Sequence, residues 1–169
     1  MPKPNPAKLK KVSVNLPFGI GGTEWEPDST ERKAAWSLYV ELVTRIAIQP
    51  LDSEQDQGLS REALSSLHSL FSTTRQILKD AGPDIGGSRE SVGGIAIAVL
   101  NRGLRPVLSK WHPLLQAWEA ERSSNVSPKK HEQNWEKEAQ FRSELELLRQ
   151  DLEQYAVALA IIAGVDYYF

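Results

Sequence analysis

Histidine and carboxylate side chains are the groups in this sequence that could act as bases or metal ligands, and none has the spacing that such chemistry requires. His131 is followed by Glu132 and Glu136. A zinc-protease motif needs a second histidine four residues on, where Trp135 stands. Paired Glu-x-x-His elements, which hold a dinuclear metal centre inside a four-helix bundle, are also missing. We therefore expect no catalytic residues, no metal ligands and no cofactor, and we predict a protein that is not an enzyme.

The three histidines have structural interpretations instead. We expect His131 to be a solvated residue in the first turn of a helix. His112 stands between Trp111 and Pro113, and a proline kink there would leave it partly buried, because proline removes a backbone donor and crowds the preceding turn. A small-ligand pocket beside His112 is the alternative. His68 falls beside an apolar helical stripe and is interpreted as a boundary residue.

Basic residues form two groups that could contact the phosphates of a nucleic acid. One is the N-terminal arm and the other a strip near two tryptophans, namely Lys8, Lys10, Lys11, Arg102, Arg105 and Lys110. Cationic and aromatic side chains together are typical of single-strand binding. The alternative is that the arginines complement helix ends and the tryptophans are core. The net charge of −2 disfavours general coating of nucleic acid, so a ribonucleoprotein subunit is an alternative and not the leading hypothesis.

Aromatic residues provide the candidates for protein contact. The chain has five tryptophans, and tryptophan is enriched at interfaces. The candidate contacts are Phe18, Trp25, Trp135, Tyr167, Tyr168 and Phe169. Phe18 and Trp25 have an alternative role as anchors that hold the arm against the rest of the chain. Trp135 lies in a densely charged stretch and is hard to bury internally.

A long apolar seam near the C-terminus must be covered by other helices. Its residues are spaced 4, 3, 4, 3, 4 and 3 apart, which keeps one face of a helix toward a partner. They are Phe141, Leu145, Leu148, Leu152, Tyr155, Leu159 and Ile162. Each large side chain gains about 1.5–3 kcal/mol on full burial, so the seam faces helices of this chain, of another chain, or of both.

The remaining elements follow from caps and breakers. Residues 1–28 are predicted to be an irregular arm, with a possible strand at 12–16 that has no obvious partner. Asp28 and Glu31 form an N-cap signature for a helix reaching Ile48. Further helices are predicted over 60–80, from about 93 to 118, and from 128 to 163. The third is expected to be broken near Asn101 and kinked or split at Pro113. The fold class is therefore all-α: an up-and-down bundle of four main helices over 29–169, with a long C-terminal helix.

Composition sets the cellular context and the leading function. The chain has no cysteine, which fits a reducing cytoplasm, and no apolar stretch approaches the roughly 20 residues of a membrane span. We expect a cytoplasmic, non-enzymatic interaction module, an adaptor or assembly subunit that binds a protein partner or self-associates. A bacterial stress or defence assembly would suit this form. The alternatives are the nucleic-acid-contacting subunit and a small-ligand-binding protein.

Overall fold

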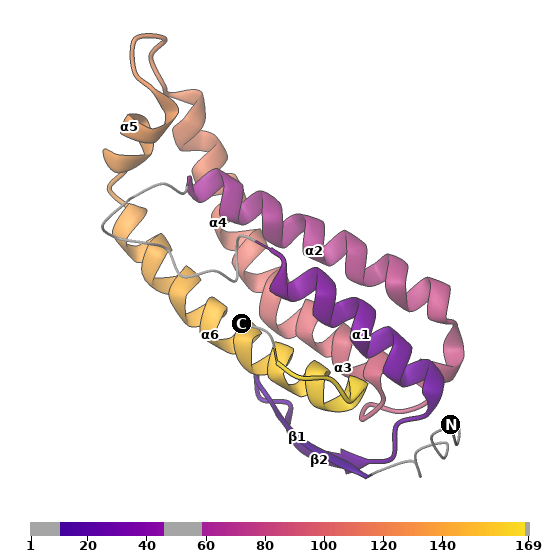
Figure 1. Cartoon of the computed structure of the whole chain (residues 1–169). Coiled ribbons are helices and arrows are strands. Elements are labelled where there is room, and N and C mark those ends of the chain that lie inside the picture. The colour runs from indigo at the N-terminus through magenta and orange to yellow at the C-terminus, as the bar shows by residue number, and fades with distance from the viewer. Residues whose placement is uncertain (1–10, 46–58, 168–169) are drawn as a thin grey trace.

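The computed structural model describes residues 11–45 and 59–167, and this part of the chain is mostly helical with one small sheet. In Figure 1 the main helices lie alongside one another. A β-hairpin lies at one end of the molecule and the short helix α5 at the other. The hairpin and α5 are therefore at opposite ends of the molecule (Figure 1).

The hairpin pairs β1 (Val12–Leu16) with β2 (Gly21–Trp25) in antiparallel register, with Val12 opposite Trp25. Side chains alternate along β1, so that Val12, Val14 and Leu16 are buried in the core. The possible strand at 12–16 is confirmed, but the expectations that it has no partner and that the rest of the arm is irregular are wrong for residues 21–25. The partner strand was missed because it begins with two glycines, which are depleted in strands.

Helix α1 (Ser29–Val43) begins at the predicted position, and α2 (Ser60–Ala81) begins and ends close to the predicted positions. Asp28 caps α1, since its carboxylate accepts a hydrogen bond from the Glu31 backbone N–H at 2.8 Å. Helix α1 ends at Val43, with Thr44 as its C-cap, so the predicted continuation toward Ile48 is wrong at residues 44–45; residues 46–48 lie outside the described residues. After α2 the chain turns at Gly82 and enters the short 3-10 turn η2 (Pro83–Gly86).

The third helical region is continuous rather than broken. Helix α3 (Val92–Ala98) leads into the π-helical segment η3 (Val99–Leu104), which leads into α4 (Arg105–Ala120). The interruption predicted near Asn101 is therefore a local widening of the helix, with hydrogen bonds five residues apart. Pro113 lies inside α4 without dividing it.

The C-terminal region is divided where one helix was predicted. Helix α5 (Pro128–Gln133) is capped by Ser127, whose hydroxyl accepts a hydrogen bond from the Lys130 backbone N–H. The chain then turns over 134–137 before α6 (Glu138–Ala163) begins. The prediction of one helix from 128 to 163 is therefore wrong.

The apolar seam of α6 is confirmed and is covered by this chain. All seven of its residues are buried, with exposed fractions of 0–6%. Helix α6 packs against α1 and β1, and the seam belongs to a core shared by the hairpin and the helices. A partner chain is not needed to bury it.

Candidate functional site

A pocket of about 520 Å³ lies between the hairpin and the α3–η3 region. This volume is within the range of about 300–1,000 Å³ that is usual for small-molecule sites. Part of its lining is apolar, from Ile20 of the hairpin turn and from Ile95, Ile97 and Ala98. Such a wall can cover the non-polar part of a ligand.

The polar lining of the pocket carries two unpaired cations. Arg89 precedes α3 and Arg102 belongs to η3. Within the described part of the chain, neither guanidinium makes a hydrogen bond or an ion pair. Glu90 also lines the pocket, so the charge of the lining is net positive. Two guanidinium groups without carboxylate partners are suited to bind an anion.

Two amide or hydroxyl side chains complete the polar lining. The Thr23 hydroxyl oxygen is buried and has no hydrogen-bond partner among the described residues. A buried polar atom without a partner costs about 1–3 kcal/mol. Asn101 uses its side-chain oxygen to accept hydrogen bonds from Arg105, at 3.2 Å from Nε and 3.1 Å from Nη2. The side-chain amide nitrogen of Asn101 makes no hydrogen bond within the described residues.

One contact that fixes the hairpin beside the pocket is between Phe18 and Gly103. A Cβ atom added to Gly103 would lie 2.5 Å from Cζ of the Phe18 ring, so only glycine allows this approach without a shift. Phe18 itself has a φ of 59°, which is uncommon for a residue with a side chain. The ring contact thus joins the turn of the hairpin to η3.

A second contact joins the hairpin to α1 and α3 through Glu31. This residue is 8% exposed, and its Oε2 accepts hydrogen bonds from Trp25 Nε1 at 3.2 Å and from the Val92 backbone N–H at 3.0 Å. The carboxylate also faces the first turn of α3, where negative charge is favoured. Glu31 and Phe18 therefore hold the pocket's walls in a defined position.

The π-helical segment is the third structural feature of the pocket. Both Asn101 and Arg102 belong to η3, and π-helical turns are frequent at functional sites. The sequence signal for this part was the expected helix break near Asn101. Arg89 and Thr23 were missed, because nothing in their local sequence distinguishes them from surface residues. Glu31 was identified only as part of the N-cap signature of α1, and its contacts with Trp25 and Val92 were not predicted.

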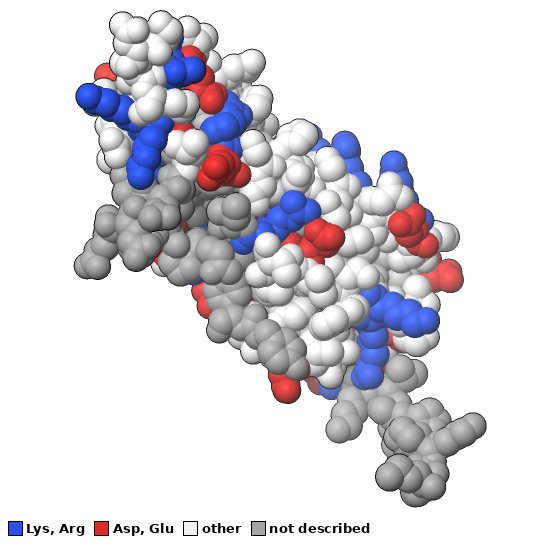
Figure 2. All heavy atoms as spheres, turned by 45° about the horizontal axis from the view of Figure 1, so that its top comes forward, with Lys and Arg blue, Asp and Glu red and all other residues white. Residues whose placement is uncertain are grey.

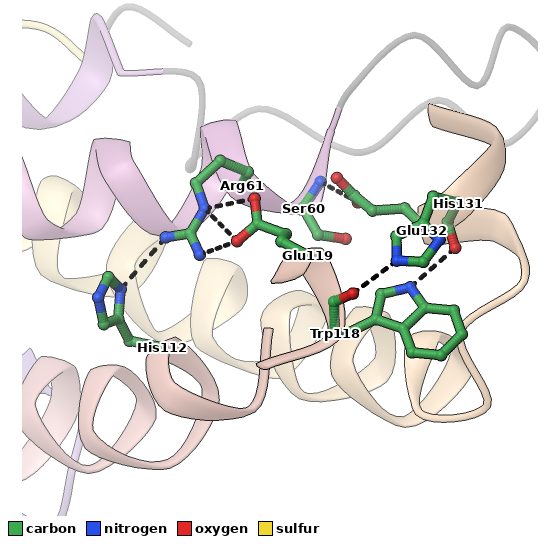
Figure 3. Close-up of polar contacts among 7 residues, drawn as sticks. All are labelled: Ser60, Arg61, His112, Trp118, Glu119, His131 and Glu132. Atoms are coloured by element: carbon green, nitrogen blue, oxygen red, sulfur yellow. Dashed lines mark hydrogen bonds and ion pairs between the residues drawn. The ribbon is translucent and has the colours of Figure 1, made fainter. Parts of the chain in front are cut away.

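At the opposite end of the molecule a polar cluster joins α2, α4 and α5 (Figure 3). Arg61 of α2 donates to both carboxylate oxygens of Glu119 on α4, through Nε at 3.0 and 3.1 Å. Arg61 Nη1 also lies 3.2 Å from Nδ1 of His112. Because arginine only donates, Nδ1 is the acceptor. His112 is exposed, so the expectation that it is partly buried at a kink is wrong.

His131 is part of the same cluster and is buried (Figure 3). Its ring stacks on Trp118 at 4.3 Å between centroids, and its Nε2 lies 2.6 Å from the Trp118 carbonyl oxygen. Trp118 Nε1 in turn donates to the His131 carbonyl oxygen at 2.8 Å. The expectation of a solvated His131 is therefore wrong, because α5 folds back onto α4.

Glu132 connects α5 to the start of α2 (Figure 3). Its Oε1 accepts a hydrogen bond of 2.6 Å from the Ser60 backbone N–H, and the N-cap residue Leu59 has no capping side chain of its own. Within residues 11–45 and 59–167, no group of three or more histidine or acidic residues could hold a metal ion. We interpret this cluster as structural.

The aromatic residues predicted to contact a partner are used within the chain where the structure describes them. Phe18 and Trp25 hold the hairpin, as above. Trp135 is 6% exposed and packs against Trp111 and Phe141, at 5.9 and 6.1 Å between centroids. The expectation that Trp135 is hard to bury is therefore wrong, because the turn at 134–137 brings its ring into the core.

Of the C-terminal aromatics, Tyr167 packs beside Tyr39 at 6.4 Å between ring centroids. Its hydroxyl lies 3.4 Å from Oε1 of Glu153. Burial, together with the nearby Glu153 carboxylate, raises the pKa of Tyr167 to about 12. Tyr168 and Phe169 lie outside the described residues.

The basic candidates are not gathered into one field. Lys11 pairs with Glu24 at 3.2 Å and Lys110 with Glu144 at 2.6 Å, while the Arg105 guanidinium lies 5.2 Å above the Phe71 ring. Figure 2 shows basic and acidic side chains interspersed on the face drawn. Arg102 is the member of the strip that lines the pocket. Lys8 and Lys10 lie outside the described residues.

No family model, curated protein or solved structure matches this chain. None of the described helices is long and apolar enough to cross a membrane. The pocket between the hairpin and η3 is therefore the feature of this chain from which a function can be inferred.

Proposed function

We propose that this protein binds a small anionic ligand, without catalysis, in the pocket between the hairpin and the α3–η3 region. The observation that carries the proposal is the pair Arg89 and Arg102, which line one pocket and have no ion-pair partner in the described chain. Guanidinium groups form short, charge-assisted hydrogen bonds with carboxylate, sulfonate and phosphate oxygens.

The rest of the lining supports a bound molecule and not only a surface ion. Binding pockets combine an apolar wall with a few placed polar groups, and here three isoleucines accompany the two arginines and Asn101. The walls are also held in place before a ligand arrives, by the Phe18 contact with Gly103 and by Glu31. A preformed site reduces the entropy lost on binding.

Amide NMR spectra recorded during titration with butyl phosphate test this proposal. We expect shifts at Gly22, Gly94, Asn101 and Arg102, and about tenfold weaker binding by Arg102→Ala, since a hydrogen bond to a charged group contributes roughly 1.5–3 kcal/mol. Arg122→Ala is the matched control, because Arg122 is exposed and follows α4 at the α5 end. The proposal would be contradicted if the amide signals of the pocket residues did not shift, or if Arg102→Ala and Arg122→Ala lost the same amount of affinity for butyl phosphate.

The adaptor role predicted from the sequence is a second candidate, favoured by exposed apolar residues on α1 and α6. Trp36 is 46% exposed, Ile161 44% and Val157 37%. Light scattering on the wild type and on Trp36→Ser tests its self-association form: a concentration-dependent mass that the substitution reduces would support it. A constant mass in both proteins would leave only a different protein as partner.

We also propose an up-and-down arrangement of the four main helices and a cytoplasmic location. The sequence favours an up-and-down arrangement of four main helices in a cytoplasmic protein. The packing of α1 against α6 and α2, and of α2 against α4, supports the arrangement of the helices. The absence of cysteine supports the cytoplasmic location.

A further inference from the structure

An apolar groove adjoins the pocket on the α3 surface. It has a volume of about 390 Å³ and is lined by Leu78 at the end of α2, by Pro83 and Ile85 of η2, and by Ile97. Three glycines and Lys79 complete the lining. The aliphatic character of this lining differs from that of the neighbouring pocket, which holds the two arginines.

Ile97 joins the two hollows, because it lines both and is 51% exposed. The two hollows are also adjacent along the backbone of α3, because Gly93 lines the groove and the next residue, Gly94, lines the pocket. A ligand that reaches from one to the other would cross Ile97. An exposed large aliphatic side chain at this junction would be covered by the apolar part of such a ligand.

We infer that the ligand is an anionic amphiphile, with its head group beside Arg89 and Arg102 and its alkyl chain across Ile97 in the groove. This inference rests on the function proposed above. The charge of the pocket and the aliphatic lining of the groove complement the two ends of such a molecule. A highly charged ligand such as a nucleotide fits less well, since Glu90 shares the pocket and Ile97 would remain exposed.

The dependence of affinity on chain length tests the inference. Calorimetric titrations with alkyl phosphates from butyl to decyl, as monomers in solution, are expected to show binding that strengthens about fourfold for each buried methylene. Ile97→Ser should weaken the binding of decyl phosphate far more than that of butyl phosphate, and so lose most of the increase with chain length. Ile161→Ser is the matched control, because Ile161 is similarly exposed but lies on α6.

The outcomes separate the inference from the function that it extends. If butyl phosphate does not bind, the proposed anion site is wrong. If butyl phosphate binds and decyl phosphate binds no more tightly, the anion site stands and the amphiphile is excluded. Equal loss of decyl phosphate binding in Ile97→Ser and Ile161→Ser would also overturn the inference. A parallel series of carboxylates distinguishes a fatty acid from a lipid phosphate as the preferred head group.

Discussion

Trp135 and Trp36 show that the local sequence is a poor guide to which tryptophan is buried. Trp135 lies in a charged stretch yet is 6% exposed, whereas Trp36 of α1 is 46% exposed. We expect Trp135→Ala to lower the free energy of unfolding by about 3–5 kcal/mol, because it removes a ring packed against two other aromatic residues. Trp36→Ala should cost less than about 1 kcal/mol.

Urea denaturation of both variants measures this difference. Similar stability losses for the two substitutions would contradict the assignment of Trp135 to the core. The exposed Trp36 also serves as the matched control for any effect of removing a tryptophan on the fluorescence signal.

Glu144 gives a second prediction at the residue scale, on pH dependence. A hydrogen bond of 2.6 Å from Lys110, with another of 2.5 Å from Trp111 Nε1, holds the pKa of this carboxyl below its usual value despite the opposing effect of burial. The folded protein therefore binds a proton here less readily than the unfolded chain. The resulting stabilisation is present above the ordinary carboxyl pKa and is lost as the pH falls through the lowered value.

We accordingly expect Glu144→Gln to be less stable than the wild type near neutral pH, with a difference that shrinks as the pH falls through the lowered pKa of Glu144. Denaturation at a series of pH values measures it. Glu136→Gln is the control, since Glu136 is exposed and makes no hydrogen bond within the described residues. A difference that stays constant or grows on acidification would contradict the account.

At the scale of elements, the turn of the hairpin packs closely against η3 where Phe18 meets Gly103. We expect Gly103→Ala to destabilise the protein by about 1–3 kcal/mol, because the added Cβ would meet the Phe18 ring at 2.5 Å. In a Phe18→Ala background the same substitution should cost much less, or become favourable, as alanine favours helix. A double-mutant cycle by denaturant unfolding measures the coupling. Additive effects would show that the ring and Gly103 do not constrain each other.

The elements that could be predicted well from the sequence are those determined by their own local residues, without contacts to distant parts of the chain. The seam of α6 follows from a regular repeat, and the start of α1 from Asp28. The turn at 134–137 could not be predicted, because it contains neither glycine nor proline and depends on Trp135 finding a place in the core. The cap of α2 could not be predicted either, because Glu132, which accepts the hydrogen bond from the Ser60 backbone N–H, comes from a distant part of the chain.

The candidate site was harder to predict than the fold. Its walls come from the hairpin turn near Ile20 and from Arg89 to Arg102, two segments that only the folded chain brings together. Arg102 was selected as a basic residue for contact with phosphate, which is close to the role now proposed. Arg89 was not selected, because its spacing in the sequence does not show that it lines the same pocket as Arg102.

At the scale of the whole molecule, the internal burial of the seam predicts the behaviour of the protein in solution. Since α6 is covered by α1 and β1, we expect a mass of 18.9 kDa that does not change with dilution. Size-exclusion chromatography with light scattering measures it. A dimer that persists at low concentration would show that another surface, such as that around Trp36, is an interface.

Reversal of the pocket's charge is the most direct test of the anion site. Calorimetry with octyl phosphate should show that Arg89→Glu combined with Arg102→Glu weakens binding by more than about tenfold for each arginine lost. The same variant should gain affinity for octylammonium, while Arg122→Glu binds octyl phosphate as the wild type does. Unchanged octyl phosphate binding in the double variant, or equal loss in the control, would contradict the account.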